Sequence, residues 1–117
     1  MPKITNVEFQ GASGRKHIFQ AYTLGTETFS DVGGVYIFTR GTRNEQGGIE
    51  KYYPLYIGQT ESLRNRLTAS HEKWPCAVQN NVDCLCVLVE ENTFSRRAIE
   101  LDLLSRYNTP CNNGTYA

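Results

Sequence analysis

Alternating apolar and polar positions predict short strands in the first half of the chain. Residues 7–10 and 18–22 alternate in this way and are joined by Gly-Ala-Ser-Gly, which predicts a β-hairpin. β-Branched and aromatic residues predict one strand over residues 35–39 and another over residues 52–57. We expect these two strands to pair antiparallel across a long, polar and glycine-rich loop at residues 40–51.

The second half of the chain combines helical spacing with one continuous apolar run. Apolar residues at helical spacing predict a helix over residues 61–73, capped by Thr60 and ended by Pro75. Residues 84–89 are apolar throughout, which indicates a central and buried strand. A last helix is predicted over residues 94–106, followed by a turn-forming tail.

This order of elements predicts one compact α/β (α+β) domain. We expect a small three-stranded, mostly antiparallel sheet flanked by helices within residues 33–117, preceded by an extra N-terminal β-hairpin within residues 1–32. Pro54 has no backbone N–H, so its strand is expected to lie at an edge or to be irregular there. A length of 117 residues leaves little room for a second domain.

Composition limits the classes of partner. Lys plus Arg and Asp plus Glu number 12 each, so the formal net charge is zero. Because neutralising phosphates supplies most non-specific affinity for nucleic acid, zero charge argues against tight, autonomous DNA binding. A local basic face is still available, since one stretch of chain contains Arg40, Arg43, Lys51, Arg64 and Arg66.

The N-terminal residues and the four cysteines bear on location. The first ten residues, MPKITNVEFQ, contain no apolar run of the secretory type, and no stretch has the length of a membrane span. We therefore expect a cytoplasmic protein with reduced thiols. Cys84 and Cys86 lie two apart in an apolar run, which favours small buried core residues over metal ligands.

Glu100 is the first candidate for chemistry. On a helical wheel it falls within the same arc as Ile99 and Leu103, whereas Asp102 falls on the other side. A carboxylate on an apolar helix face is costly unless it is paired or binds a metal. The pattern leaves two interpretations open: a metal ligand, or a partly exposed residue paired with Arg96 four positions earlier.

Arg66 and two tyrosines are the other candidates. Arg66 borders the apolar face of the first predicted helix, where its guanidinium can meet phosphate oxygens or simply remain solvated. Tyr36 and Tyr56 each lie in a predicted strand near glycine, and paired strands can project both phenols from one face of a sheet. A phenol can act as an acid, a base or a hydrogen-bond donor to phosphate, although a single strand tyrosine more often serves only in packing.

Taken in order, these residues form a pattern that closely resembles the GIY-YIG nuclease family. The first motif of the family appears as Gly34-Val35-Tyr36, and the second as Tyr56-Ile57-Gly58 within LYIGQTESLRNRL. Arg66 follows Tyr56 by ten residues, where the family has its helix arginine. The resemblance covers residues 33–113 and implies the fold of that family for this part of the chain.

Two more residues match the family pattern, and two positions differ from it. Glu100 matches the metal-binding glutamate of a late helix, and Asn112 matches the asparagine that follows it after a proline. Gln59 replaces the lysine of excision-repair members, and Ser70 stands where homing and restriction members often have a histidine. His71 comes one residue later, about 100° further round a continuous helix, so its assistance to Tyr36 is left open.

The resemblance implies an endonuclease that hydrolyses a phosphodiester bond with one Mg²⁺ or Mn²⁺ ion. Glu100 would hold the ion and Arg66 would donate to a non-bridging oxygen. Tyr36 would accept a proton from the attacking water or position it, Tyr56 would bind the water or phosphate, and Asn112 would brace the site. Contacts with nucleic acid, DNA rather than RNA, are expected from Arg40, Arg43, Lys51, Gln59 and Arg66.

Other functions remain open at the level of sequence. A catalytically silent nucleic-acid-binding or interaction module with the same fold is favoured slightly by the zero net charge. A ribonuclease or toxin-like nuclease is a weaker interpretation. It stays open because the sequence has no identifiable base-reading element that would separate RNA from DNA. A partner protein would supply target recognition, no membrane association is expected, and the oligomeric state is left open.

Overall fold

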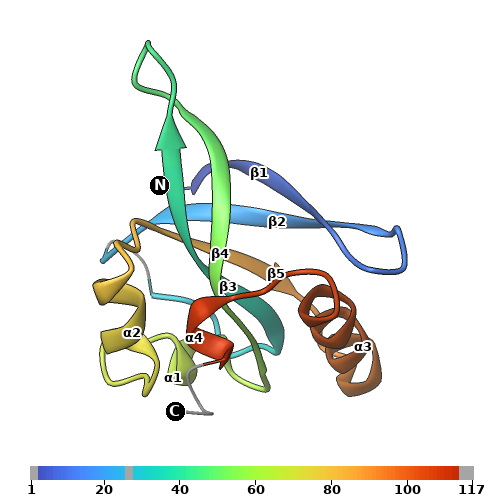
Figure 1. Ribbon diagram of the computed structural model, residues 1–117. Helices are drawn as coiled ribbons and strands as arrows, with labels where there is room; N and C mark the ends of the chain where they lie inside the picture. Colours follow the sequence, from blue (N-terminus) through green and yellow to red (C-terminus); the bar gives the residue numbers. More distant parts are fainter. Residues whose placement is uncertain (1–2, 26–27, 114–117) are drawn as a thin grey trace.

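A five-stranded antiparallel sheet in the order β1-β2-β5-β3-β4 forms the centre of the molecule (Figure 1). The computed structural model describes residues 3–25 and 28–113. The strands are β1 (Lys3–Gln10), β2 (Lys16–Thr23), β3 (Gly34–Arg43), β4 (Ile49–Thr60) and β5 (Cys84–Val89). The helices of the described residues are α1 (Leu63–Arg66), α2 (Trp74–Gln79), α3 (Thr93–Leu104) and α4 (Pro110–Asn113). The class is therefore α+β.

The N-terminal hairpin enlarges the sheet, so the prediction of three strands is wrong. β1 and β2 form the predicted hairpin, but β2 also pairs antiparallel with β5, with Gln20 opposite Val87 and Thr23 opposite Cys84. Without β2, β5 would leave a row of unpaired backbone groups at a sheet edge. The pairing makes β5 the middle strand, which confirms the central position predicted for residues 84–89.

β3 and β4 continue far beyond the sheet as a two-stranded ribbon, visible at the top of Figure 1. The predicted loop at residues 40–51 is therefore wrong for most of its length, because pairing extends to Arg43 opposite Ile49. Alternation of polar and apolar residues is weak in a ribbon that contacts solvent on both faces, so the pattern did not reveal it. The prediction for Pro54 is confirmed: β4 is an edge strand, and its register shifts next to this residue.

The helix predicted over residues 61–73 is wrong as a continuous element. α1 ends at Arg66, and a stretch of turns leads to α2 at Trp74. Ser62, rather than Thr60, caps α1 by accepting a hydrogen bond from the backbone N–H of Asn65. Pro75 lies in the first turn of α2, where no N–H is needed, so it starts a helix instead of ending one.

The last predicted helix is confirmed as α3. Asn92 caps it by accepting a hydrogen bond from the backbone N–H of Ser95. The tail expected to form turns contains the short helix α4, and residues 114–117 lie outside the described part of the chain. None of the helices in the described residues has the length and apolar character that crossing a bilayer requires.

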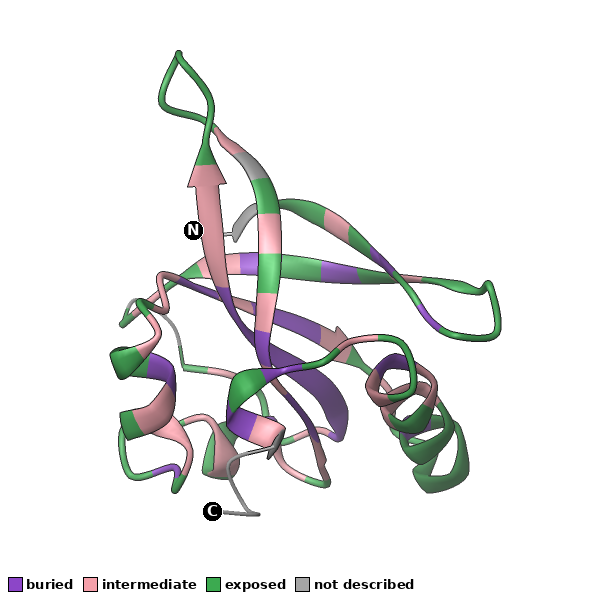
Figure 2. Ribbon diagram, in the orientation of Figure 1, coloured by how far each residue is buried: buried purple, intermediate pink, exposed green. Residues whose placement is uncertain are grey.

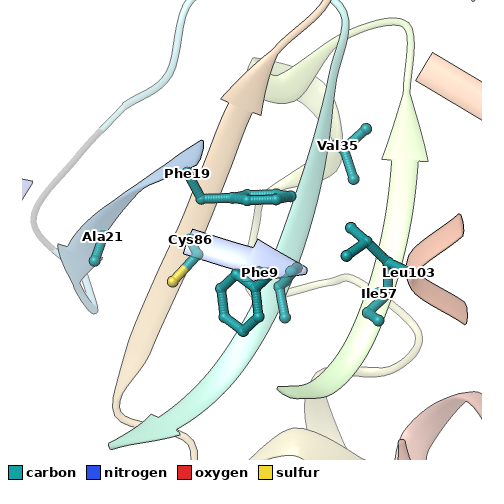
Figure 3. Packing of buried hydrophobic residues seen from close by; sticks show 8 residues of the cluster. Phe9, Phe19, Ala21, Val35, Ile57, Cys86 and Leu103 are labelled. Atoms are coloured by element: carbon teal, nitrogen blue, oxygen red, sulfur yellow. The ribbon is translucent and has the colours of Figure 1, made fainter. Parts of the chain in front are cut away.

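Both faces of the sheet are covered, which explains why β3 is buried along its first half (Figure 2). On one face a cluster packs against α3; it comprises Phe9, Phe19, Ala21, Val35, Ile37, Ile57, Cys86 and Leu103 (Figure 3). The opposite face carries Tyr36 and Phe38, which pack with Leu63 of α1 and Ala77 of α2. Alternation along β3 thus sends Tyr36 toward α1 and α2, away from the α3 core.

The expectation that all four cysteines are reduced thiols is wrong for two of them. Cys76 of α2 and Cys111 of α4 form a disulfide with Cα atoms 5.8 Å apart. Their pairing was not visible in the sequence, because 35 residues separate them. Cys84 and Cys86 are free and buried, which confirms their assignment to the core.

A polar contact fastens the N-terminal hairpin to α3. The Asp102 carboxylate accepts hydrogen bonds from the Ser13 backbone N–H and hydroxyl, both at 2.8 Å, and lies 2.8 Å from Nε2 of His17. These contacts lower the pKa of Asp102 to about 2, with the His17 hydrogen bond as the largest cause. Asp102, which falls on the polar side of the helical wheel, is therefore a structural residue.

Candidate active site

Tyr36 and Tyr56 lie together on the face of the sheet that carries α1 and α2. The strand register places Phe38 opposite Tyr56 and Tyr36 opposite Gly58, and the two tyrosine ring centres are 6.1 Å apart. Tyr36 crosses directly over Gly58: a Cβ atom at that glycine would lie 2.6 Å from the phenol oxygen. The glycine of the second motif is thus required for the first motif's tyrosine to reach the site.

His71 contacts the same phenol. Its Nε2 atom is 2.7 Å from the oxygen of Tyr36, and its Nδ1 atom accepts a hydrogen bond from the Lys73 backbone N–H at 3.0 Å. Because Nδ1 is an acceptor, the proton of the neutral ring lies on Nε2, and His71 donates to Tyr36. The turn that follows α1 carries the ring back over the sheet, where it packs against Phe38 and Tyr56.

Arg66 completes the cluster around Tyr36. Its Nε–H donates to the Tyr36 oxygen at 3.3 Å, and its two terminal nitrogens donate to both carboxylate oxygens of Glu72, at 2.7 and 2.5 Å. Arg64, two positions earlier in α1, instead forms an exposed ion pair with Asp31 at 3.1 Å. The side chains of the two arginines therefore contact different residues, as expected for two positions separated by two residues on a helix.

Protonation in the cluster is controlled mainly by burial. Burial, followed by the neighbouring Tyr56, raises the pKa of Tyr36 well above its ordinary value. Burial also raises the pKa of Tyr56, against the opposing effect of Arg66. Burial and then the charge of Arg66 lower the pKa of His71 below 6.5. At neutral pH the site contains two phenols and a neutral imidazole.

Glu100 carries a half-buried carboxylate on α3. Burial raises its pKa, and the nearby charge of Arg97 opposes the shift. The charge of Glu100 also contributes, after larger effects, to the environment of Tyr56, so the two groups share one electrostatic region. Glu100 forms no ion pair with a residue that the structure describes, and no group of three or more His, Cys, Asp or Glu side chains gathers there as a ready-made metal site.

Arg96 makes contacts other than a pairing with Glu100, which was one of the two interpretations left open by the sequence. It is 2% exposed and donates from Nε to the Gln59 side-chain oxygen at 2.8 Å. It also donates to the backbone oxygens of Glu90 and Glu91. The side-chain oxygen of Gln59, predicted to contact nucleic acid, is thus engaged within the fold. The position of Arg96 three residues before Ile99, on the apolar helix face, was a usable signal of its burial.

Asn112 braces the edge strand. Its side-chain oxygen accepts from the Ile57 backbone N–H at 2.8 Å, and its side-chain nitrogen donates to the Ile57 backbone oxygen at 3.0 Å. The amide therefore pairs with β4 as a neighbouring strand would, directly beside Tyr56. Cys111, the preceding residue, is tied to α2 by the disulfide, so the brace is anchored to the helix that follows His71.

The basic residues of the ribbon divide between its two faces. Arg40 pairs with Tyr53, and its guanidinium lies over the tyrosine ring, 5.5 Å from the ring centre. By strand alternation Arg40 and Lys51 continue the sheet face of Tyr36, whereas Arg43 lies on the other face and donates to the Gly47 backbone oxygen at 3.1 Å. The face of the ribbon that extends from the site thus carries two of the three cations.

No protein-family model, no curated protein and no solved structure matches this chain. The geometry of the site is therefore the basis for assigning a function. Two residues of that geometry, Arg96 and Glu72, were not among the candidate site residues taken from the sequence. Arg96 had a signal in its helical spacing, but Glu72 had none, because only the turn between α1 and α2 brings it back to Arg66.

Proposed function

We propose that this chain is a metal-dependent endonuclease of the GIY-YIG type, acting on phosphodiester bonds of nucleic acid and preferring DNA. The observation that carries the proposal is the cluster in which one buried phenol, Tyr36, receives N–H donors from both His71 and Arg66. A tyrosine that served packing alone would not need a buried imidazole and a guanidinium on its oxygen. The sequence left open whether His71 assists Tyr36, and its contact with the phenol supports including it among the site residues.

The residues of the cluster would divide the work of hydrolysis. Water attacks phosphorus and loses a proton to solvent, the P–O bond to the leaving oxygen breaks, and that oxygen takes a proton from solvent, while negative charge grows on the non-bridging oxygens in the transition state. Arg66 supplies planar donors to those oxygens. Because burial raises the pKa of Tyr36 further above neutrality, its phenol is a poor base, and we assign it to positioning the attacking water rather than removing its proton. His71 fixes the orientation of Tyr36, and Tyr56 donates to the water or phosphate.

Glu100 fits one divalent ion. Its carboxylate is half-buried and has no ion-pair partner among the described residues, and such a group favours a cation in its vicinity. A site with one carboxylate suits Mg²⁺, which retains several waters and binds substrate phosphate. When bound, the ion would act as a Lewis acid that offsets charge developing on the phosphate.

The ribbon supports a role in contacting DNA beside the site. Arg40 and Lys51 lie on the face that continues from Tyr36, and the major groove of B-DNA accepts a two-stranded ribbon. With a net charge of zero, the chain would bind weakly and depend on a partner protein for target recognition. A cytoplasmic location is part of the proposal, and the Cys76–Cys111 disulfide is the observation that weighs against it.

A second function is favoured by one contact. The terminal nitrogens of Arg66 are occupied by Glu72 rather than open to phosphate. This arrangement would suit a nucleic-acid-binding or interaction module that has kept the fold and lost cleavage.

A plasmid-nicking assay with Mg²⁺ or with a chelator separates the two functions. The nuclease proposal expects Mg²⁺-dependent nicking by the parent chain and none by Glu100→Gln. Equal nicking by both, or no nicking by the parent in Mg²⁺ or Mn²⁺ with binding intact, would favour the silent module or a contaminant. Fold is checked in each variant by circular dichroism.

A further inference from the structure

Glu72 occupies the end of the Arg66 side chain that a phosphate would need. Both terminal nitrogens of the guanidinium point at the two carboxylate oxygens, at 2.7 and 2.5 Å, in a two-point arrangement. Carboxylates and phosphates are bound by arginine through this same pair of parallel N–H donors. Nε lies outside the pair and contacts Tyr36. The fork formed by the two terminal nitrogens can therefore bind a phosphate at two points only where Glu72 now lies.

The two partners differ in how firmly they are held. The side chain of Glu72 is 60% exposed, whereas that of Arg66 is 33% exposed and also tied to buried Tyr36. Displacing Glu72 therefore moves a largely solvated carboxylate and leaves the arginine in place. An exposed ion pair contributes little free energy, so a phosphate that also contacts the rest of the site can replace it.

We propose that Glu72 is an internal competitor for the phosphate of the substrate: it holds Arg66 neutralised in the resting site and is displaced when a phosphodiester binds. This inference rests on the proposed function for the identity of the substrate. The competition itself needs only that Arg66 binds phosphate. Its effect is to weaken the binding of isolated phosphate groups and to favour a polyanion that makes several contacts at once.

The other interpretation is that Glu72 stays in place and positions Arg66 during the reaction. The two interpretations predict opposite changes in phosphate affinity when Glu72 is removed. A competitor, when removed, leaves phosphate bound more tightly and lowers KM with little change in kcat. A positioning residue, when removed, leaves Arg66 misaligned, so phosphate binds more weakly and kcat falls.

The test uses Glu72→Gln in the full chain and inorganic phosphate as the probe, without metal. Glutamine keeps the shape of glutamate but loses its charge. Glu61→Gln is the matched control, because Glu61 is exposed and makes the same change in net charge near α1. Binding is followed by the NMR signal of the Arg66 Nε–H, and a Glu72→Gln, Arg66→Ala double variant, followed by backbone amide signals, reports phosphate bound elsewhere.

We expect Glu72→Gln to bind phosphate about two- to fivefold more tightly than the parent, the size of an exposed ion pair. Glu61→Gln should bind like the parent, and the double variant should lose the gain. Equal affinities of Glu72→Gln and Glu61→Gln, weaker binding by Glu72→Gln, or no Arg66-dependent binding in any variant would each overturn the inference.

Cleavage kinetics keep this inference separate from the proposed function. If the parent chain does not cut nucleic acid but the phosphate gain is present, the nuclease proposal fails and the competition stands. If the parent cuts nucleic acid but Glu72→Gln binds phosphate no more tightly than the parent, the competition fails and the nuclease proposal stands. If both are present, Glu72→Gln should lower KM for the nucleic acid by a similar factor and leave kcat near that of the parent.

Discussion

The Nε2 atom of His71 lies 2.7 Å from the phenol oxygen of Tyr36, across 35 positions of sequence. Its Nδ1 atom accepts from the Lys73 backbone N–H, so the ring is locked with its proton directed at the tyrosine. His71 is thereby a donor to Tyr36 and has no lone pair directed at a water on that phenol. The contact orients the phenol and does not remove its proton.

Alanine substitutions at Arg66 and at Arg64 should have different effects on the cleavage rate. Arg66→Ala should lose on the order of 10²–10³ in cleavage rate, because a donor aligned with growing phosphate charge is removed. Arg66→Lys should also be impaired, since a point charge does not reproduce the fork. Arg64→Ala should change the rate little, because Arg64 pairs with Asp31 on the surface. Single-turnover cleavage of one labelled substrate measures all three, and equal losses at both positions would remove any special role for Arg66.

Glu100→Gln should abolish metal-dependent cleavage and stabilise the fold at neutral pH. Burial raises the folded-state pKa of Glu100 above its unfolded value near 4.5, so the ionised form is disfavoured in the folded state. That penalty is absent below the unfolded pKa and grows as pH rises through the folded pKa. Thermal unfolding of parent and variant should therefore differ at pH 7 and converge below about pH 4. A variant less stable than the parent at pH 7 would contradict this account.

His71 should give the fold a pH dependence on the acid side of neutrality. Its folded pKa lies below the unfolded value of 6.5, so its stabilising contribution is complete above 6.5 and is lost as pH falls through the folded pKa. His71→Gln should flatten the free energy of unfolding measured by urea between pH 7 and 5. A parent curve that is already flat across this range would show that His71 is not held neutral by burial.

Asn112→Ala should destabilise the protein by about 1–3 kcal/mol, because the backbone N–H and oxygen of Ile57 lose their partners. Asn65→Ala, at an exposed position of α1, is the control and should change stability little. Denaturant unfolding measures both. An Asn112→Ala variant that keeps full stability but loses cleavage would assign the residue to the phosphate instead of to β4.

Arg40 and Lys51 should set the salt dependence of weak DNA binding. Replacing both with alanine should lower affinity for duplex DNA and reduce the slope of log K against log salt by roughly 0.9 for each phosphate that is no longer neutralised. Arg106→Ala removes an exposed cation that follows α3 and lies over the ring of Tyr107, and it should leave the slope near that of the parent. Fluorescence anisotropy over a range of salt concentrations makes the comparison. Equal slopes for all variants would exclude the ribbon as the contact surface.

Local sequence determined the features that depend on one element at a time. The period of two along β3 and β4 showed that Tyr36 and Tyr56 can share one face if the strands pair, and the continuous apolar run identified β5 as a buried strand. Helical spacing located α3 and placed Glu100 within the arc of its apolar face. Each of these follows from backbone geometry within a few residues, so the sequence contains the information.

Tertiary structure alone decided how those elements meet. The two N-terminal strands could have remained a separate hairpin, but the open edge of β5 offered backbone partners to β2 from Gln20 to Thr23. The chain between α1 and α2 breaks its helical period, and only the turn that results can bring His71 to Tyr36 and Glu72 to Arg66. Hydrogen bonds between distant residues depend on the direction of the whole chain after each turn, and no pattern of spacing along the sequence encodes that direction.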